Sequence, residues 1–414
     1  MSYIEDLCAA AKAAEAAICG ISSAKKNEAL SLIAKALTDN TDFILAENAK
    51  DLENAEKNGM SPSMQDRLRL SSDRIKKMSD AVMEVVALKD PIGDVIGGGE
   101  LPNGLKIVQK RVPMGVIGII FESRPNVTVD AAVLCLKAGN VCVLRGGSDA
   151  IYSNKCLTGI MRGALKEAGV CEDAISLVVD TSRQVAGEFM KMNKYLDLLI
   201  PRGGHGLISS VVQNATVPVI QTGEGNCSVY VDEFADIGMA VNIVDNAKTQ
   251  RPSVCNAIEN VLVHKNVAEA FFTALNKKWD GKVKIFGDEL TMKYIPTERE
   301  ATEEDFAAEF LDFSIAAKTV SGIDEAIAFI NKYGTGHSEA IVTINIINAE
   351  KFQREVDAAA VYVNASTRFT DGNEFGLGAE IGISTQKLHA RGPMGLEAIT
   401  TYKYIINGSG QIRS

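Results

Sequence analysis

The chain has 414 residues, of which 46% are hydrophobic and 23% are charged, and it carries a net charge of −10. This composition is too apolar for a disordered protein, and the length predicts two or three domains. The acidic balance argues against a nucleic-acid partner, because proteins that bind nucleic acids usually present a basic field. We also expect no membrane partner, since the sequence has neither a basic start followed by an apolar run nor 18 consecutive apolar residues.

Residues 1–85 predict a helical region, because apolar side chains recur there at helical spacing, and Ser22 is suited to cap the second helix. The pattern of apolar residues changes near residue 101. Segment 101–112 predicts a β-hairpin with Asn103 and Gly104 at its turn.

Between residues 115 and 222, short apolar runs alternate with segments of helical spacing. The predicted strands are 115–120, 141–145, 175–179, 196–200 and 217–222, and the predicted helices include 127–138 and 153–168. Such alternation predicts a parallel sheet, in which ligands bind beyond the carboxyl ends of the strands. Two of these ends are rich in glycine, namely Arg145-Gly146-Gly147-Ser148 and Arg202-Gly203-Gly204.

A second alternating block is predicted from Ala235 to Asn364, so the fold class is α/β. Its strands are expected at 256–264, 314–320, 340–345 and 359–364, and its helices at 239–249, 267–277, 324–331 and 350–356. The loop 286–308 carries only weak signals. The final apolar run, 400–406, predicts an isolated strand that must pair with an edge. We expect it to join a neighbouring subunit, so that the hairpin and the tail support a homo-oligomer.

The eight cysteines are scattered without a CxxC pair, and the four histidines lack zinc-ligand spacing, so we expect no metal. This usage suits free thiols in a reducing cytoplasm. Cys135 and Cys142 lie inside apolar patterns that are typical of a core. Cys255 instead lies on a loop between a predicted helix and a predicted strand, beside Arg251. The pattern leaves open whether it is a reactive thiol or a small core residue.

Several stretches, taken in order, resemble the aldehyde dehydrogenase superfamily and, within it, the γ-glutamyl phosphate reductase family, over residues 5–408. The most specific are VPMGVIGIIFESRPNVTVDAA, LIPRGG, QTGEGNCSVYVD, QRPSVCNAIE, YGTGHSEAI and the long run from Val361 to Tyr404. The resemblance implies a Rossmann-type parallel-sheet cofactor domain, a second α/β catalytic domain and a small β oligomerisation flap. On this basis we predict an NADP-binding domain at 1–100 and 113–234, a catalytic domain carrying Cys255 at 235–380, and an oligomerisation hairpin and tail at 101–112 and 381–414.

The resemblance also implies a reaction, the NADPH-dependent reduction of L-glutamyl 5-phosphate to L-glutamate 5-semialdehyde and phosphate. This would be the second step of proline biosynthesis from glutamate, with glutamate 5-kinase as the upstream enzyme. Cys255 would attack the carbonyl, release phosphate and hold a thioester that accepts a hydride. Hydrolytic relatives place a Glu that activates water where this chain has Gln221, which cannot act as a general base. Gln221 can also be a purely structural residue, and Glu224 lies close by in the sequence.

The same resemblance suggests donors to the thioester oxyanion, which are the side-chain amide of Asn126 and the backbone N–H of Cys255. Asn126 is equally suited to cap the helix 127–138. The candidate cofactor residues are Arg145, Gly146, Gly147, Ser148, Gly203, Gly204 and Glu309. Relatives that prefer NAD often carry a Glu where Ser148 stands, so Ser148 near Arg145 favours the 2′-phosphate of NADPH/NADP+. A glycine turn without a ligand and a solvated helical Glu309 are the alternatives.

The expected substrate presents a carboxylate, an ammonium and a phosphate, and Arg binds the anionic groups bidentately. The candidate substrate residues are Arg124, Arg251, Ser366, Thr367 and Arg368, while Arg202 and Arg391 also lie in loops. Any of these arginines can instead be structural. The rival functions are a CoA-acylating aldehyde dehydrogenase, a nonenzymatic nucleotide-binding module and a thiol hydrolase. A requirement for phosphate separates the leading hypothesis from a CoA-acylating aldehyde dehydrogenase. A nonenzymatic module would keep its function in Cys255→Ala.

Overall fold

The computed structural model describes residues 2–413, which form two compact units. The first contains the chain up to Gln221, Gly376–Gly382 and the residues from Met394 onward, and the second contains Thr222–Phe375 and Ile383–Pro393. The predicted boundary after residue 234 lies too late, because the strand β7 (Cys227–Val231) pairs inside the sheet of the second unit. The predicted tail 381–414 is likewise divided between the two units.

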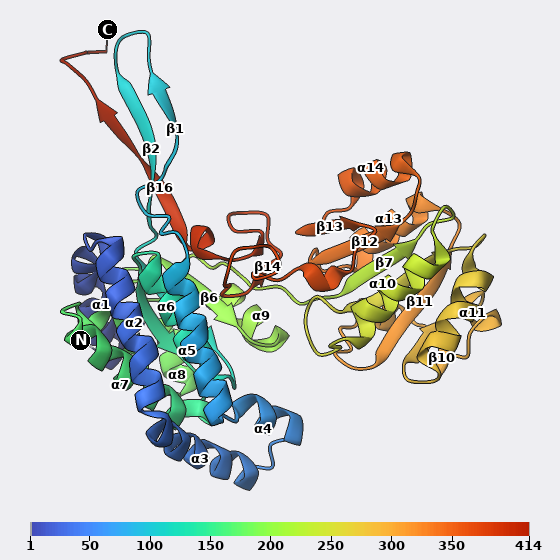
Figure 1. The fold of residues 1–414 in the computed structure, drawn as a ribbon, viewed down its shortest axis with the longest axis horizontal. Helices are drawn as coiled ribbons and strands as arrows, with labels where there is room; N and C mark the ends of the chain where they lie inside the picture. Colours follow the sequence, from blue (N-terminus) through green and yellow to red (C-terminus); the bar gives the residue numbers. More distant parts are fainter. Residues whose placement is uncertain (1, 414) are drawn as a thin grey trace. The chain divides into compact units, whose positions relative to one another are not determined.

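The N-terminal part of the first unit is helical, as the apolar spacing predicts. Its helices are α1 (Tyr3–Cys19), α2 (Ser23–Asp39), α3 (Thr41–Lys57), α4 (Pro62–Leu68) and α5 (Ser72–Ala87). The predicted cap at Ser22 is confirmed, since its hydroxyl accepts a hydrogen bond from the backbone N–H of Lys25 at 3.2 Å. Helix α2 packs against α5 beside it (Figure 1).

A four-stranded parallel sheet with the order β5-β4-β3-β6 forms the core of this unit. The strands are β3 (Val116–Phe121), β4 (Val141–Arg145), β5 (Ile175–Leu177) and β6 (Leu198–Arg202), and the helices that connect or follow them are α6 (Pro125–Lys137), α7 (Ile151–Glu167), α8 (Arg183–Phe189) and α9 (His205–Asn214). Every residue of β3 is buried, as its continuous apolar run requires. The predicted strand 217–222 is reduced to two isolated bridges, one between Leu199 and Val219 and one between Thr222 and Ser384.

A second sheet of the first unit has three antiparallel strands in the order β1-β2-β16. It comprises β1 (Val95–Glu100), β2 (Lys106–Pro113) and β16 (Thr400–Asn407), and extends away from the helices of its own unit (Figure 1). The predicted turn at Asn103 and Gly104 is confirmed, with Gly104 at a φ of 80°. The prediction for the tail was wrong in one respect, because β16 finds its edge on β2 of the same chain.

The second unit is built on a parallel sheet of seven strands in the order β10-β9-β11-β8-β7-β12-β13. Besides β7, these are β8 (Ile258–His264), β9 (Lys284–Gly287), β10 (Arg299–Glu300), β11 (Ser314–Val320), β12 (Ser338–Val342) and β13 (Ala360–Val363). The helices are α10 (Ile237–Thr249), α11 (Ala268–Trp279), α12 (Glu303–Ala307), α13 (Ile323–Tyr333) and α14 (Ile346–Glu355), and β14 (Ile383–Ser384) pairs with β15 (Gly392–Pro393). Alternate residues of β7 enter two cores, because Val229 packs with Phe271 of α11 while Tyr230 packs with Phe352 of α14.

The loop 286–308, weak in sequence signals, contains β10 and α12. Arg299 donates hydrogen bonds to both oxygens of Asp305 at 2.5 and 2.7 Å, and Thr302 N donates another at 2.8 Å. The hydrogen bond from Arg299 is the largest cause that holds the pKa of Asp305 down, to about 2. The segment is thus fixed by a charged capping box.

Asp305→Asn should therefore destabilise the fold in a pH-dependent way. Because the folded-state pKa lies below the ordinary value of 3.8, the carboxylate contributes stability above that pH and loses it as the pH falls toward about 2. We expect a loss of about 1–2 kcal/mol at pH 7, moderated by the exposure of Arg299 to water. Urea unfolding between pH 7 and pH 3 measures it, with Glu289→Gln at an exposed ion pair as the control. A difference that stays constant with pH would contradict the assignment.

Among the described residues, no helix is long and apolar enough to cross a membrane. The same part of the chain contains no cluster of three His, Cys, Asp or Glu side chains able to hold a metal ion.

Candidate active site

The side chain of Cys255 is less buried than those of most of the other cysteines. Five of the eight cysteines are buried, and burial raises the pKa of Cys8 to about 12, that of Cys156 to about 11, and those of Cys142 and Cys227 well above the ordinary value. Cys255 is only partly buried, as is Cys171. Cys171 precedes Glu172 and Asp173, whereas Cys255 lies among arginines, and a positive environment favours the nucleophilic thiolate.

The loop 250–257 holds Cys255 between the end of α10 and the start of β8. The backbone of Gly225 lies directly against it, since a Cβ placed on Gly225 would come within 1.4 Å of the carbonyl oxygen of Cys255. Cys227 donates from its Sγ to the same carbonyl oxygen at 3.2 Å. Two segments that the sequence resemblance singled out, 221–232 and 250–259, therefore meet at the backbone of Cys255.

A second loop, 366–370, is bonded to the first. Thr367 Oγ1 donates to the carbonyl oxygen of Asn256 at 2.7 Å, and Asn256 Nδ2 donates to that of Thr370 at 2.9 Å. Ser366 Oγ accepts from the backbone N–H of Arg368 at 3.3 Å. Ser366 and Thr367, which were predicted to bind substrate, are buried and use these hydroxyls to shape the loop.

This loop brings Arg368 to Cys255. Its Nε donates to Gln250 Oε1 at 2.8 Å. Burial lowers the pKa of Arg368, the positive charge of Arg251 lowers it further, and the charge of the Cys255 thiolate opposes both. The structure thus brings three predicted residues together, Cys255, Arg251 and Arg368. Arg391, in contrast, is bonded to Asp357 at 2.7 Å.

A buried ion pair beneath these loops was not foreseen. Lys248 Nζ lies 2.5 Å from Glu259 Oε2, and both side chains are completely buried. Burial raises the pKa of Glu259 to about 7 and lowers that of Lys248. Glu259 also accepts a hydrogen bond from the backbone N–H of Leu311 at 3.2 Å, which fixes the segment after α12.

That segment carries Glu309. Its Oε1 accepts a hydrogen bond from the N–H of Gly225 at 2.8 Å, and burial raises its pKa. The alternative of a solvated helical Glu is wrong, because α12 ends at Ala307 and Glu309 is partly buried. Glu309 therefore orders the glycine that touches Cys255.

In the first unit, Asn126 lies in the first turn of α6. Arg124 is the N-cap residue, and no side chain caps this helix, so Asn126 is not the cap that its residue type suggested. Its Nδ2 instead donates to Asp130 Oδ2 at 2.9 Å. Burial raises the pKa of Asp130 to about 6, against the hydrogen bond from Asn126 and the charge of Arg202. Asp130 was not predicted as a site residue, although its spacing of four residues from Asn126 places both side chains on one helix face.

The glycine-rich end of β4 is crowded by side chains. A Cβ on Gly146 would lie 2.1 Å from Asn154 Nδ2, and one on Gly147 would lie 2.3 Å from Asp149 Oδ1. Arg145 donates from Nη2 to the carbonyl oxygen of Thr181 at 2.9 Å, and burial lowers its pKa. Ser148 begins a short 3-10 helix with Asp149, whose carboxylate accepts a hydrogen bond from Ser123.

At the end of β6, Glu122 meets the predicted pyrophosphate loop. The register sets Phe121 opposite Arg202, so the carboxyl ends of β3 and β6 are adjacent. Gly204 N donates to Glu122 Oε2 at 3.0 Å, and a Cβ on Gly203 would lie 2.5 Å from that same oxygen. An acidic oxygen is thus held at the start of α9, a position that favours anions.

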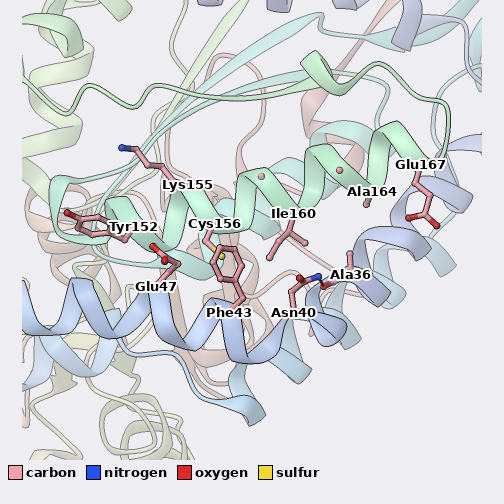
Figure 2. Close-up of a pocket in the computed structure, with 12 residues that line it drawn as sticks. Ala36, Asn40, Phe43, Glu47, Tyr152, Lys155, Cys156, Ile160, Ala164 and Glu167 are labelled. Atoms are coloured by element: carbon pink, nitrogen blue, oxygen red, sulfur yellow. Dashed lines mark hydrogen bonds between the residues drawn. The ribbon is translucent and has the colours of Figure 1, made fainter.

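A separate groove lies between α2, α3 and α7, where Phe43 and Asn40 face Ile160 and Cys156 (Figure 2). None of the predicted site residues lines it. The thiol of Cys156, which lines this groove, has a pKa raised by burial and is therefore a poor nucleophile.

Comparison with known proteins agrees with this geometry. The model of the aldehyde dehydrogenase family matches residues 2–294 and 315–405. A gamma-glutamyl phosphate reductase from Caldicellulosiruptor saccharolyticus is 59% identical over 407 residues, which cover 97% of each chain. The crystal structure of gamma-glutamyl phosphate reductase from Thermotoga maritima has a TM-score of 0.98 and 48% identity, with 100% of both chains covered. An acetylating aldehyde dehydrogenase from Geobacillus thermoglucosidasius, with 18% identity and a TM-score of 0.71 over 99% of this chain and 97% of the other, shares the fold alone.

The chain therefore belongs to the aldehyde dehydrogenase family and, within it, to the gamma-glutamyl phosphate reductases. The predicted α/β fold is confirmed. Membership of the family implies a nicotinamide cofactor.

Proposed function

We propose that this chain reduces L-glutamyl 5-phosphate to L-glutamate 5-semialdehyde and phosphate with NADPH, in the cytoplasm, as the second step of proline biosynthesis. The observation that carries the proposal is the position of Cys255 on a loop that contains Arg251 and is hydrogen-bonded to Arg368, in a chain that is 59% identical to a gamma-glutamyl phosphate reductase. Glutamate 5-kinase is then the upstream enzyme, because its product is this acyl phosphate. The antiparallel sheet β1-β2-β16, whose last strand keeps an open edge, is the surface proposed for homo-oligomerisation.

The proposed chemistry begins at the sulfur of Cys255. Its thiolate attacks the acyl carbon, the bond to phosphate breaks, and a thioester remains on the enzyme. Arg251 and Arg368 bind the phosphate that leaves, because guanidinium groups pair with phosphate oxygens bidentately. The backbone N–H of Cys255 and the amide of Asn126 donate to the oxygen on which negative charge develops. Arg124 and the loop at Ser366 and Thr367, whose hydroxyls are bonded within the loop, complete the wall of the substrate site.

NADPH supplies the hydride that converts the thioester to the aldehyde and returns the thiolate. Arg145, Gly146, Gly147, Ser148, Gly203, Gly204 and Glu309 are the residues proposed to bind it. Arg145 fits such a ligand, because its Nε is buried without a hydrogen bond in the structure. Position 148, where relatives that prefer NAD often carry a Glu, is Ser148 in this chain. Its hydroxyl and the guanidinium of Arg145 favour the 2′-phosphate of NADPH.

The absence of a general base at Gln221 protects the thioester from water. An amide cannot take a proton from water, so hydrolysis lacks the help that a Glu would give it. Phosphate, bound by the arginines, is then the efficient acceptor of the acyl group in the reverse direction.

The reverse reaction tests the proposal directly. Glutamate semialdehyde and NADP+ should yield NADPH, followed by its absorbance, at a rate that depends on inorganic phosphate. Coenzyme A should not replace phosphate, which separates this activity from that of a CoA-acylating aldehyde dehydrogenase. Equal rates with and without phosphate, or a preference for coenzyme A, would remove the proposed function.

A further inference from the structure

Asp130 is a carboxylate that the proposed chemistry does not use. It lies one turn along α6 from Asn126, and the two side chains are joined by the 2.9 Å hydrogen bond from Nδ2 to Oδ2. The amide nitrogen of Asn126 has a second N–H, which can donate to a bound group. Such a group then lies at most about two hydrogen-bond lengths, about 6 Å, from the carboxylate oxygen of Asp130.

The charge of Asp130 is only weakly compensated. Among the ion pairs found for residues 2–413, none includes Asp130. The one positive charge that acts on its titration is that of Arg202, at the end of β6. Partial burial raises the pKa of this carboxyl to about 6, so at pH 7 most of it is an ionised group that lacks much of its hydration. Such a group is stabilised by any cation that a ligand brings.

The proposed substrate carries a cation at the matching distance. Four bonds separate its reacting carbonyl carbon from its α-nitrogen, which is about 5 Å in an extended chain of single bonds of about 1.5 Å. The α-carboxylate is attached to the same carbon as this ammonium. Arg202 acts on Asp130 without forming a close ion pair, and it is therefore suited to receive that carboxylate.

We propose that Asp130 binds the α-ammonium group of the substrate, beside the Asn126 amide that holds the carbonyl, and that Arg202 binds the α-carboxylate. This assignment rests on the proposed function and makes α6 the element that distinguishes an amino acid from a simple acyl chain. Asp130 then acts as a specificity-determining residue, separate from the nucleophile.

Asp130→Asn isolates the charge. An Asn at this position keeps an oxygen that can accept from Asn126 Nδ2, and removing a carboxylate whose burial is unfavourable should not destabilise the fold. The variant and the wild type are compared with glutamate semialdehyde and with 5-oxopentanoate, which lacks only the amino group. We expect kcat/KM for glutamate semialdehyde to fall by about 10- to 100-fold, since hydrogen bonds to charged groups contribute about 1.5–3 kcal/mol. For 5-oxopentanoate the change should stay within about threefold, and Asp80→Asn on the exposed face of α5 should alter neither.

The other outcomes are equally decisive. An equal loss with both substrates would show that Asp130 only orients Asn126, and no loss with either would show that it is not used. Binding of L-glutamate and of glutarate, measured by thermal shift, gives a readout that needs no turnover. Suppose that the wild type shows no turnover and yet binds L-glutamate more tightly than glutarate. If Asp130→Asn loses that preference, the proposed reaction is rejected and this inference stands. A wild type that does not distinguish the two ligands would overturn the inference itself.

Discussion

Replacing Cys255 with alanine is expected to lower kcat by at least about 10³-fold, because the covalent step has no other nucleophile. The remaining cysteines cannot substitute, since five are buried, Cys171 lies beside acidic residues, and Cys19 is the exposed last residue of α1, outside the site. The side chain of Cys255 is partly exposed, so its truncation should leave the melting temperature almost unchanged. The measurement is the rate of NADPH formation from glutamate semialdehyde, NADP+ and phosphate.

A burst experiment separates the chemical step from a general loss of activity. Without phosphate, the wild type should release close to one NADPH per subunit as the aldehyde becomes a thioester on Cys255, and then stop. Addition of phosphate should restart turnover, because it takes the acyl group. Cys255→Ala should show no burst, whereas Cys171→Ala should behave like the wild type. A burst that survives in Cys255→Ala would exclude this sulfur as the site of acylation.

Gly225→Ala is expected to have the second largest effect, although this residue contributes no side chain. The added Cβ would lie 1.4 Å from the carbonyl oxygen and 2.5 Å from the Cα of Cys255, so the two backbones must move apart. Displacement of a reacting group by about 1 Å can lower the rate by about 100-fold. We expect a loss of that size in kcat and a decrease of about 1–3 kcal/mol in the free energy of unfolding, as for overpacked interiors.

A matched glycine in the same unit provides the control. At Gly238 in the first turn of α10, the nearest atom to an added Cβ is Asp236 Oδ1 at 3.4 Å, an ordinary contact. Gly238→Ala should therefore keep full activity and gain up to about 1 kcal/mol of stability from the higher helix propensity of alanine. If Gly225→Ala kept the activity of the wild type, the close contact with Cys255 would have no part in holding the nucleophile.

Sequence patterns predicted most of the longer helices and strands, because their apolar periodicity reflects burial directly, but they did not predict the helices α8, α9 and α12. They missed β1, whose Gly97, Gly98 and Gly99 offer no side chains to give an alternating pattern. They also missed β7, because the predicted domain boundary placed Cys227–Val231 between two blocks, although this strand lies inside the second sheet.

The candidate site was predictable where chemistry resides in a motif. Cys255, Arg251 and Arg368 were singled out by the segments that surround them, and the structure brings them together. The pair of Lys248 and Glu259 was not predictable, because it joins a helix to a strand across a loop, and neither spacing nor composition indicates such a contact. Glu122 illustrates the same limit, since its contact with Gly204 depends on the adjacency of β3 and β6 in the sheet.

The pairing of β16 with β2 has a consequence for how the chain is made. Contacts between these strands join residues as much as 301 positions apart, namely Lys106 and Asn407. A ribosome adding 5–20 residues per second needs about 15–60 seconds to produce the second partner after the first. During that time one edge of β2 has no strand to pair with, and an unpaired edge is a template for contacts between nascent chains. Newly synthesised molecules should therefore depend most on chaperones before their last strand is released, and stop codons placed just before Thr400 should give chains that aggregate.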